Sequence, residues 1–388
     1  MASSTSRARI REVLPNIRLG RWAPGKLNSI TDVPGVLVHT ESIQPEQGIN
    51  TGVTTIVPRP DWTEYSSFAG VFSFNGCGEL TGTHWINETG LLTSPIIVTS
   101  TGAVGDAYRG IMEYCFRYHT DKDGEMNLFI VPAVGETYDG FLSDLSRFAV
   151  TPEHIIRGIR SATADAVPEG NTGGGTGMIC HRFKGGTGSS SRIVKGTDIS
   201  GKEVSYTVGV LVQANYGATE TFHVQGIPVG QIIKDEAASA ASKQEQPENP
   251  NEARKDGSII IVIATDAPLL PIQLQRLAKR ATVGLGKVGG YGNNTSGDIF
   301  IAFSTANDIP FQQVGPNGTE VHPYKPLPQA VQMCDNDSVN ALFESAADAT
   351  EEAILNAVCM AQTLTGLKGR TVDALDLDQL KRIVAARS

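Results

Sequence analysis

The amino-acid sequence predicts a mixed α/β protein organised around buried β-strands. Three observations support this class. Residues 259–263 form a continuous run of Ile and Val, which is typical of a strand buried on both faces. Valines alternate at positions 208, 210 and 212, which indicates a second strand. Apolar residues recur at helical spacing between 270 and 281 and again toward the carboxyl terminus, which indicates helices packed on a core.

The composition fits a globular protein and excludes several classes of partner. The chain has 388 residues, of which 40% are hydrophobic and 19% charged, which suits a sizeable core. The formal net charge of −9 does not provide the basic surface that nucleic-acid binding requires. We therefore expect no nucleic-acid partner. No apolar run is long enough to cross a bilayer, so we also expect no membrane partner. We expect a cytoplasmic location, and the Arg- and Ser-rich first residues leave a transit peptide as the alternative.

Cysteine and histidine spacing does not indicate a metal site or a standard hydrolase. The histidines form no HExxH pattern, and no serine lies in a GxSxG elbow. The cysteines lack CxxC spacing, so we expect buried free thiols rather than disulfides or a zinc site. These cysteines are Cys77, Cys115, Cys180, Cys334 and Cys359.

The first half of the chain predicts strands, then helices, then a loop-rich stretch. Segments 52–74 and 91–105 read as short β-branched strands interrupted by glycine. Helical patterns follow at 139–149 and again from Thr151, which is a suitable N-cap. Residues 170–191 are dominated by Gly, Thr and Ser, which predicts loops.

A polar tract ends directly at a predicted core strand. Residues 234–257 have alanine as their only aliphatic residue and are rich in charge, Asn and Ser, so they predict a mobile surface segment. Such a tract is more often an interdomain linker. Here, however, Ser258 opens directly into the apolar run 259–263, so the mobile segment is joined to the core.

Helices and one further strand are predicted beyond this point. Thr265 or Asp266 can cap a helix that ends near Gly284. A glycine-rich turn then leads through Ser296 and Asp298 into an apolar strand. The remaining helical patterns cover residues 337–364 and 371–385.

Two glycine-rich motifs match phosphate-binding loops only superficially. Gly284, Gly286 and Gly289 fit GxGxxG, but they follow a predicted helix instead of leaving a strand, so they cannot place a pyrophosphate at a helix N-terminus. The motif GNTGGGTGM at 170–178 lacks the GK[ST] ending of a phosphate loop. We interpret it as a tight turn near an active site.

The Gly257-Ser258 join has the residues for self-cleavage. Glycine can adopt strained or positive-φ geometry that brings the serine hydroxyl onto its own preceding carbonyl, as an N→O acyl shift requires. Scission would leave an N-terminal serine whose α-amine, with a pKa of about 8, can take the hydroxyl proton at neutral pH. From these residues alone, an ordinary turn is the commoner interpretation.

Several motifs recur in a fixed order over most of the chain. They are NGCGELTG at 75–82, VGETYDG at 134–140, GNTGGGTGM with FKGGTGSSSR at 170–192, VLVQANYG at 210–217, DGSIIIVIATDAPLLPIQLQRLAKRATVGLGKVGG at 256–290 and GNNTSGDIFIAFSTAN at 292–307. In this order they resemble the DmpA-like family of self-processing enzymes. That family comprises L-aminopeptidases with D-Ala-esterase/amidase activity and β-peptidyl aminopeptidases.

The resemblance implies roles for individual residues. It makes Ser258 the nucleophile, freed by cleavage after Gly257. Ser296 and Asp298 match the family's pair that hydrogen-bonds around the nucleophile and its amine, and their i, i+2 spacing puts both on one face of a strand. Some members carry Glu at the position of Asp298, so the shorter side chain leaves its reach open. Asn215 corresponds to the oxyanion-hole amide, with an ordinary turn Asn as the alternative.

Two residues of VGETYDG match the family's substrate-binding groups. Glu136 resembles the carboxylate that recognises the substrate's free ammonium, and a carboxylate in a solvated loop is the alternative. Tyr138 resembles the phenol that lines that pocket, and core packing with a satisfied hydroxyl is the alternative.

The resemblance also implies a fold and an assembly. We expect a single four-layer αββα sandwich over residues 1–388, of the type shared with ornithine acetyltransferase. Cleavage divides it into an α chain, 1–257, and a β chain, 258–388, without dividing the domain. Relatives assemble as tetramers of αβ units, so we expect a homo-oligomer.

The implied function is release of N-terminal residues from short peptides, amino-acid amides or esters. It proceeds through an acyl-enzyme on Ser258, without a metal or an organic cofactor. One alternative is an acyltransferase of the ornithine acetyltransferase type, although that family uses threonine as its nucleophile. The other is an unprocessed, non-catalytic binding protein.

Overall fold

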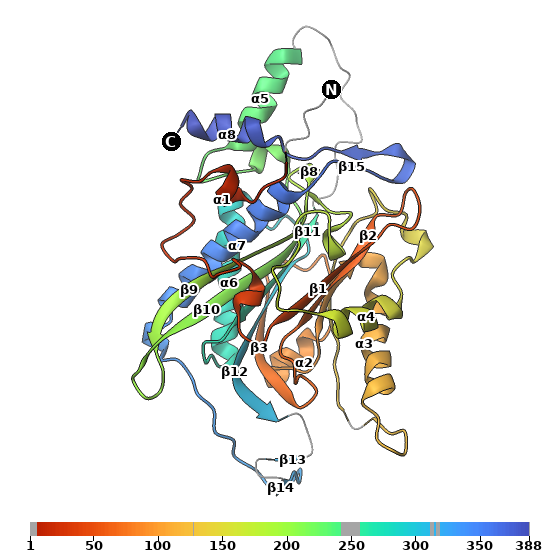
Figure 1. The fold of residues 1–388 in the computed structure, drawn as a ribbon, viewed down its shortest axis with the longest axis vertical. Coiled ribbons are helices and arrows are strands. Elements are labelled where there is room, and N and C mark those ends of the chain that lie inside the picture. Colours follow the sequence, from red (N-terminus) through yellow and green to blue (C-terminus); the bar gives the residue numbers. More distant parts are fainter. Residues whose placement is uncertain (1–5, 127, 242–256, 311–313, 316–318, 388) are drawn as a thin grey trace.

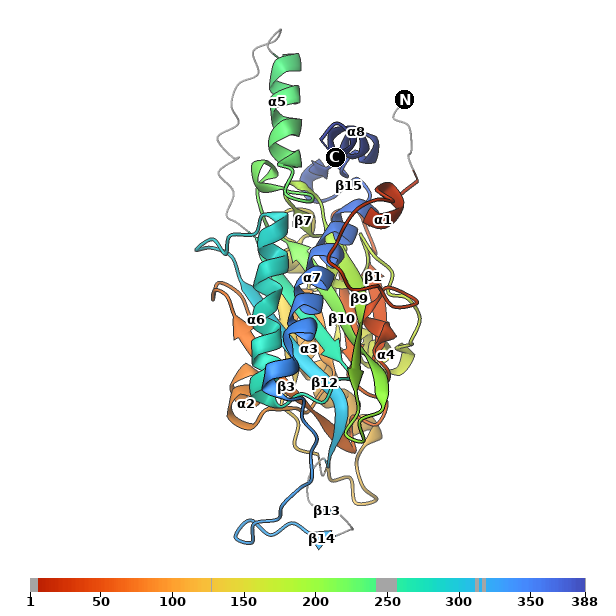
Figure 2. The same ribbon diagram turned by 90° about the vertical axis from the view of Figure 1, so that its left-hand side faces the viewer.

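Two β-sheets stack face to face, and helices cover the outer face of each sheet (Figure 1, Figure 2). The structure is a computed structural model, which describes residues 6–126, 128–241, 257–310, 314–315 and 319–387. A separate apolar cluster fills each of the three interfaces between these layers. The arrangement confirms the four-layer αββα sandwich that the resemblance implied.

The smaller sheet has four strands in the order β1-β2-β5-β6. These strands are β1 Leu37–Ile43, β2 Thr51–Val57, β5 Ile96–Ser100 and β6 Ala133–Thr137. Only β5 and β6 are parallel. Helices α3 (Val104–Tyr118) and α4 (Pro152–Ser161) cover its outer face through residues such as Ile111 and Ile155.

The larger sheet has six strands in the order β4-β3-β12-β11-β10-β9. These strands are β4 Leu91–Leu92, β3 Tyr65–Ser73, β12 Asp298–Pro310, β11 Ser258–Thr265, β10 Glu203–Asn215 and β9 Gly186–Thr197. Helices α6 (Pro271–Val288) and α7 (Asn340–Met360) cover its outer face. The predicted core strand is β11, and all of its residues are buried, as expected for an inner strand.

Alternation along β11 determines which way the side chain of Ser258 points. Ile259 and Ile261 belong to the cluster under the helices, whereas Ile260 and Val262 belong to the cluster between the sheets. Because side chains alternate between faces, Ser258 faces the space between the two sheets. This orientation directs its hydroxyl toward the smaller sheet.

The remaining elements are short or lie at the periphery. They are helices α1 (Ile10–Val13), α2 (Thr83–Thr89), α5 (Val229–Ala241) and α8 (Leu377–Ala385), with strands β7 Ile179–Cys180, β8 Phe183–Lys184, β13 Val314–Gly315, β14 Thr319–Glu320, β15 Leu364–Thr365 and β16 Thr371–Val372. Helices α5 and α8 lie together at one end of the molecule (Figure 1), where Arg382 pairs with Glu236 at 2.5 Å.

Several predicted elements differ in the structure. The helix expected at 139–149 is wrong, because this segment contains only the short turn η3 (Leu145–Arg147). The Asp144 carboxylate accepts the Ser146 N–H at 3.1 Å, a local bond that competes with helix formation. The strand expected at 91–105 ends at Ser100, and helix α3 begins at Val104.

The prediction of loops over 170–191 is wrong for residues 186–191, which form the start of β9. Glycine and serine suit this strand because α7 lies directly on it. A Cβ at Gly188 would overlap the carbonyl oxygen of Ala353, and Ser190 Oγ donates to the carbonyl of Ala349 at 2.7 Å. The composition therefore reflects close packing rather than an irregular backbone.

The predicted starts of two helices are also corrected. Helix α6 begins at Pro271, because the Asp266 carboxylate accepts the Thr207 N–H at 2.6 Å and does not cap the helix. The last helix begins at Leu377 rather than at 371. Gly284 and Gly286 lie inside α6, so GxGxxG does not form a dinucleotide turn.

The polar tract before Ser258 is partly helical. Residues 234–241 form the carboxyl-terminal part of α5, as their alanine content favours, and residues 242–256 lie outside the described part of the chain.

Cys77 is exposed, so the expectation that all cysteines are buried is wrong. No helix in the described part of the chain has the length and apolar character needed to cross a bilayer.

Candidate active site

Ser258 lies where the central strand of the larger sheet begins. It pairs with Asn215 of β10 on one side, and the parallel register with β12 places Gly297 on the other side. The Gly297 N–H donates to Ser258 Oγ at 3.1 Å. Ser258 is only 7% exposed. Its hydroxyl is therefore held in a largely enclosed position by a backbone donor.

Gly257 is required by close packing. A Cβ at this position would overlap the carbonyl oxygen of Asn215. The φ of Gly257 lies outside the left-handed region, so the positive-φ alternative for this glycine is not adopted. The structure instead requires glycine because only a hydrogen fits between the residue and strand β10.

Ser296 and Asp298 lie together beside Gly257, as expected. Ser296 Oγ is within hydrogen-bonding distance of the Gly257 carbonyl oxygen and, at 2.7 Å, of Asp298 Oδ1. Its single proton can be donated to one of these oxygens at a time. Ser296 precedes β12 rather than lying within it, so a turn and not strand periodicity brings the pair together.

Asn75 is a site residue that the sequence analysis missed. Its Oδ1 accepts the backbone N–H of Asp298 at 2.6 Å, and its Nδ2 donates to Asp298 Oδ2 at 3.0 Å. Nδ2 also donates to the carbonyl of Asn293 at 3.1 Å. The sequence feature that could have identified Asn75 is its position as the first residue of NGCGELTG, where a predicted strand is followed by a glycine-rich loop.

Asn215 is the last residue of β10, and its side chain is fixed at both ends. Its Oδ1 accepts the Ile179 N–H at 2.8 Å, and its Nδ2 donates to the carbonyl of Tyr138 at 3.0 Å. The same nitrogen lies 3.2 Å from the point that a Cβ of Gly257 would occupy. An amide N–H is thus held next to the carbonyl-bearing residue of the Gly257–Ser258 bond, and the turn alternative is wrong.

Glu136 lies in β6 of the smaller sheet and is 5% exposed. Its Oε1 accepts the Glu79 N–H at 3.1 Å, and its Oε2 accepts the hydroxyl of Thr101. Burial raises the pKa of this carboxyl above its ordinary value, against the effect of these two donors. The alternative of a solvated-loop carboxylate is therefore wrong.

Tyr138 lies at the border of the site and is 51% exposed. Its ring lies directly over Gly140, where an added Cβ would overlap the ring and Leu145. The alternative of a buried core tyrosine is wrong. Its backbone carbonyl holds the Asn215 amide, so the residue contributes to the site through the main chain as well.

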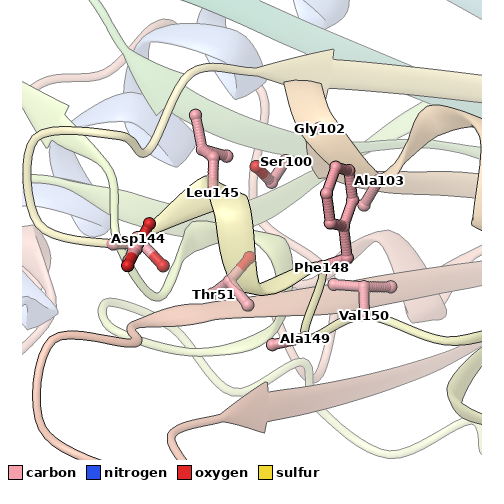
Figure 3. A pocket seen from close by; sticks show the side chains of 10 residues that line it. Thr51, Ser100, Gly102, Ala103, Asp144, Leu145, Phe148, Ala149 and Val150 are labelled. Atoms are coloured by element: carbon pink, nitrogen blue, oxygen red, sulfur yellow. The ribbon is translucent and has the colours of Figure 1, made fainter.

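Two small open hollows adjoin these residues. Ser296 and Asp298 line the first, together with the turns 216–218 and 289–293. The second contains none of the expected site residues; Figure 3 shows the Phe148 ring beside Ala103 at one end and Asp144 at the other. This second hollow adjoins the turn that carries Thr101, the partner of Glu136.

Two buried ionisable groups lie behind the site. Asp139 Oδ1 accepts the Ser100 hydroxyl at 2.7 Å, and burial raises the pKa of Asp139 to about 6. Lys184 Nζ donates to the carbonyl of Met178 at 2.7 Å, and burial lowers the pKa of Lys184 to about 7.

The expected tight turn at 170–178 is confirmed: it contains η4 (Gly173–Gly175) and leads to Ile179, whose backbone N–H donates to Asn215 Oδ1.

Known proteins resemble this chain over nearly its whole length. The model of a family described as Peptidase family S58 matches residues 28–372. The β-peptidyl aminopeptidase BapA of Sphingosinicella microcystinivorans is 42% identical over 371 residues, which cover 93% of this chain and 88% of that protein.

Solved structures share the fold. A β-aminopeptidase of Burkholderia sp. has a TM-score of 0.81 and 40% identity, covering 98% of this chain and 99% of its own. The L-aminopeptidase D-Ala-esterase/amidase of Ochrobactrum anthropi has a TM-score of 0.81 and 36% identity, covering 97% and 98%. It is described as a prototype of the serine aminopeptidases and a variant of the Ntn-hydrolase fold.

Proposed function

Because this chain belongs to peptidase family S58 and is a serine-type aminopeptidase, we propose that Ser258 is its nucleophile and that the Gly257–Ser258 bond is cleaved by the chain itself. The substrates are short peptides, amino-acid amides and esters with a free amino end. The observation that carries this proposal is the position of Ser258 Oγ, which accepts the Gly297 N–H next to the Gly257 carbonyl.

Self-cleavage begins with attack of Ser258 Oγ on the carbonyl carbon of Gly257. The Ser296 hydroxyl is in place to donate to the carbonyl oxygen as it becomes negative. The peptide bond is replaced by an ester, the hydroxyl proton passes to the leaving nitrogen, and water then hydrolyses the ester. This leaves residues 1–257 as an α chain and Ser258 as the amino end of a β chain in one domain.

In turnover, the freed α-amine of Ser258 serves as the base. It takes the hydroxyl proton as Oγ attacks the substrate carbonyl, and it returns that proton to the departing amine. Ser296, paired with Asp298, orients the amine through hydrogen bonds. The Asn215 amide donates to the tetrahedral oxyanion, a role supported by its position beside Gly257. Water finally releases the acyl group.

Glu136 binds the substrate's ammonium from the opposite sheet, and Tyr138 lines the same pocket. Burial of the carboxylate strengthens its attraction for a cation, since the dielectric screening is weak there. A blocked amino end lacks this partner, so the site selects free N-termini.

The assembly and the location remain proposals. A homo-oligomer, with a tetramer of αβ units as implied by the resemblance, is supported by exposed apolar side chains along residues 321–333, among which Tyr324 is 89% exposed. Size-exclusion chromatography with light scattering checks this, and an αβ monomer would contradict it. Cytoplasmic location and the absence of a nucleic-acid partner, a membrane partner and a cofactor stay predictions.

Replacement of Ser258 by Ala tests the proposed function. We expect one uncut, inactive polypeptide, because the same hydroxyl serves cleavage and turnover. The wild type should give two chains by denaturing mass spectrometry, the second starting at Ser258. Ser205→Ala, at an exposed serine in β10, is the control and should behave as the wild type. Two fragments from Ser258→Ala, or an active wild type that is continuous through 258, would contradict the mechanism.

A further inference from the structure

We propose that the loop of residues 75–79 is one positioning element that sets the distance between the acyl-transfer centre and the ammonium-binding carboxylate. It thereby governs the choice between α- and β-amino acid residues in the substrate. The inference rests on the proposed function of Ser258 and Glu136. It is carried by contacts that connect the two ends of this short loop to the two ends of the site.

The first end of the loop holds Asp298. Asn75 binds both the backbone N–H and the carboxylate of Asp298, at 2.6 and 3.0 Å. This leaves Asp298 Oδ1 for Ser296. An asparagine side chain suits this task because it offers an acceptor and a donor together, whereas an aspartate offers only acceptors.

The middle of the loop lies on the backbone that supports the nucleophile. The Cys77 N–H donates to the carbonyl of Ser296 at 3.2 Å. A Cβ at Gly78 would lie 3.0 Å from Gly297 Cα and 3.4 Å from Glu136 Oε1. Gly78 therefore separates the residue that donates to Ser258 Oγ from the carboxylate that would bind ammonium.

The second end of the loop holds Glu136. The Glu79 N–H donates to Glu136 Oε1, and the Glu136 N–H donates to the carbonyl of Glu79, both at 3.1 Å. Leu80 then forms a bridge with Gly135. Since β6 and β12 belong to different sheets, the loop joins the two sheets at the site.

This arrangement bears directly on substrate choice. A β-amino acid has one more methylene between its amine and its carbonyl, which lengthens that span by up to about 1.5 Å. The carbonyl must reach Ser258 while the ammonium reaches Glu136. A loop that fixes both ends of this span decides which length of substrate is bound in a reactive geometry.

Gly78→Ala tests the inference, with Gly76→Ala as its matched control. The Gly78 methyl wedges the loop away from Gly297, whereas a Cβ at Gly76 meets nothing within 4 Å. The substrates are the p-nitroanilides of β-homoalanine and L-alanine. We expect the β-to-α ratio of kcat/KM to rise by about tenfold in Gly78→Ala, because sub-ångström shifts alter reactive geometry strongly. Gly76→Ala should keep the wild-type ratio.

The ratio does not depend on the active fraction, so partial misfolding does not obscure the result. An unchanged ratio in Gly78→Ala, or an equal shift in Gly76→Ala, overturns the inference. Glu136→Asp shortens the side chain that binds the ammonium, which lengthens the distance between this carboxylate and Ser258. It should therefore also raise the β-to-α ratio of kcat/KM. A shift in Glu136→Asp without one in Gly78→Ala also overturns the role of the loop. Failure of the wild type to cleave after Gly257 would instead refute the proposed function.

Asn75→Asp examines the other end of the loop. It places two carboxylates against each other, which disturbs Asp298 and Ser296 but not Glu136. We expect kcat to fall for both substrates, while KM stays near wild-type values. A merely structural defect would lower the active fraction and slow cleavage of the precursor, but it would leave kcat per active site unchanged. Titration of active sites measures this kcat. An unchanged kcat per active site would overturn the role of Asn75.

Discussion

Asn215 and Ser258 are direct partners in the antiparallel pairing of β10 and β11. The pair lies at the last residue of β10 and the first residue of β11. The side chain of Asn215 is anchored by the Ile179 N–H and the Tyr138 carbonyl, which hold its amide next to Gly257. Sheet register therefore sets the position of an amide donor relative to Ser258.

Asn215→Ala removes this donor. We expect kcat to fall by about 10²- to 10³-fold, since loss of one oxyanion donor costs about 2.7–4 kcal/mol. KM should change little, because the bond forms mainly in the transition state. Steady-state kinetics on fully cleaved enzyme measure both constants. An unchanged kcat, or a loss confined to KM, would remove Asn215 from the oxyanion site.

Glu136→Gln removes the charge that binds ammonium. We expect KM for L-alanine p-nitroanilide to rise by about 10- to 100-fold, since a hydrogen bond to a charged group contributes about 1.5–3 kcal/mol. Cleavage after Gly257 should be unaffected. Glu79→Gln is the control, because the Glu79 side chain is exposed and the residue holds Glu136 through its backbone N–H and carbonyl, which the substitution keeps. Equal effects of the two substitutions would argue against a specific role for Glu136.

The pH dependence of KM should report the same carboxyl. Burial raises the pKa of Glu136, and only the charged form binds ammonium. KM should therefore rise as the pH falls through that raised pKa, above the ordinary glutamate range. Glu136→Gln should lack this increase. A wild-type KM that is flat across the acidic range would show that the carboxylate does not bind the substrate's charge.

Gly257→Ala introduces a methyl group where the Asn215 carbonyl already lies. We expect cleavage to be blocked, because the bond must move away from Ser258 Oγ to relieve the overlap. Mass spectrometry over time measures the uncut fraction. Gly286→Ala is the control, since a Cβ there meets nothing within 4 Å. Wild-type cleavage of Gly257→Ala would show that this contact does not position the bond.

Asp139 should make stability depend on pH. Its pKa rises on folding from 3.8 to about 6, so the folded state binds the proton more tightly. Stability is then fully present below about pH 4 and falls by up to about 3 kcal/mol as the pH rises through 6. Asp139→Asn keeps an acceptor for Ser100 and should melt at a higher temperature than the wild type at pH 8. Asp123→Asn, at an exposed position, is the control.

Melting temperatures measured from pH 4 to pH 8 test this prediction. The buried neighbour Lys184 has its pKa lowered to about 7 and contributes a change of opposite sign, since its stability contribution is lost as the pH falls through that value. The difference between the wild type and Asp139→Asn isolates the carboxyl. Parallel curves for the two proteins would contradict the assignment.

The sequence by itself determined the core strand and the position of the serine. The run 259–263 is apolar and β-branched at every position, which is typical of a strand buried on both faces, as β11 is. The ordered motifs identified the family, and the polar tract ends directly before Ser258. These features are local, so residue pattern was sufficient to detect them.

Only the tertiary structure decided how the site is assembled. Asn75 reaches Asp298 across 223 positions in the chain, and Glu79 reaches Glu136 across 57 positions, so no local pattern contains these contacts. The reason for glycine at 257 is a neighbouring carbonyl from β10 rather than its own backbone angle. Burial of Glu136 likewise depends on what packs around it, because desolvation is a property of the folded chain.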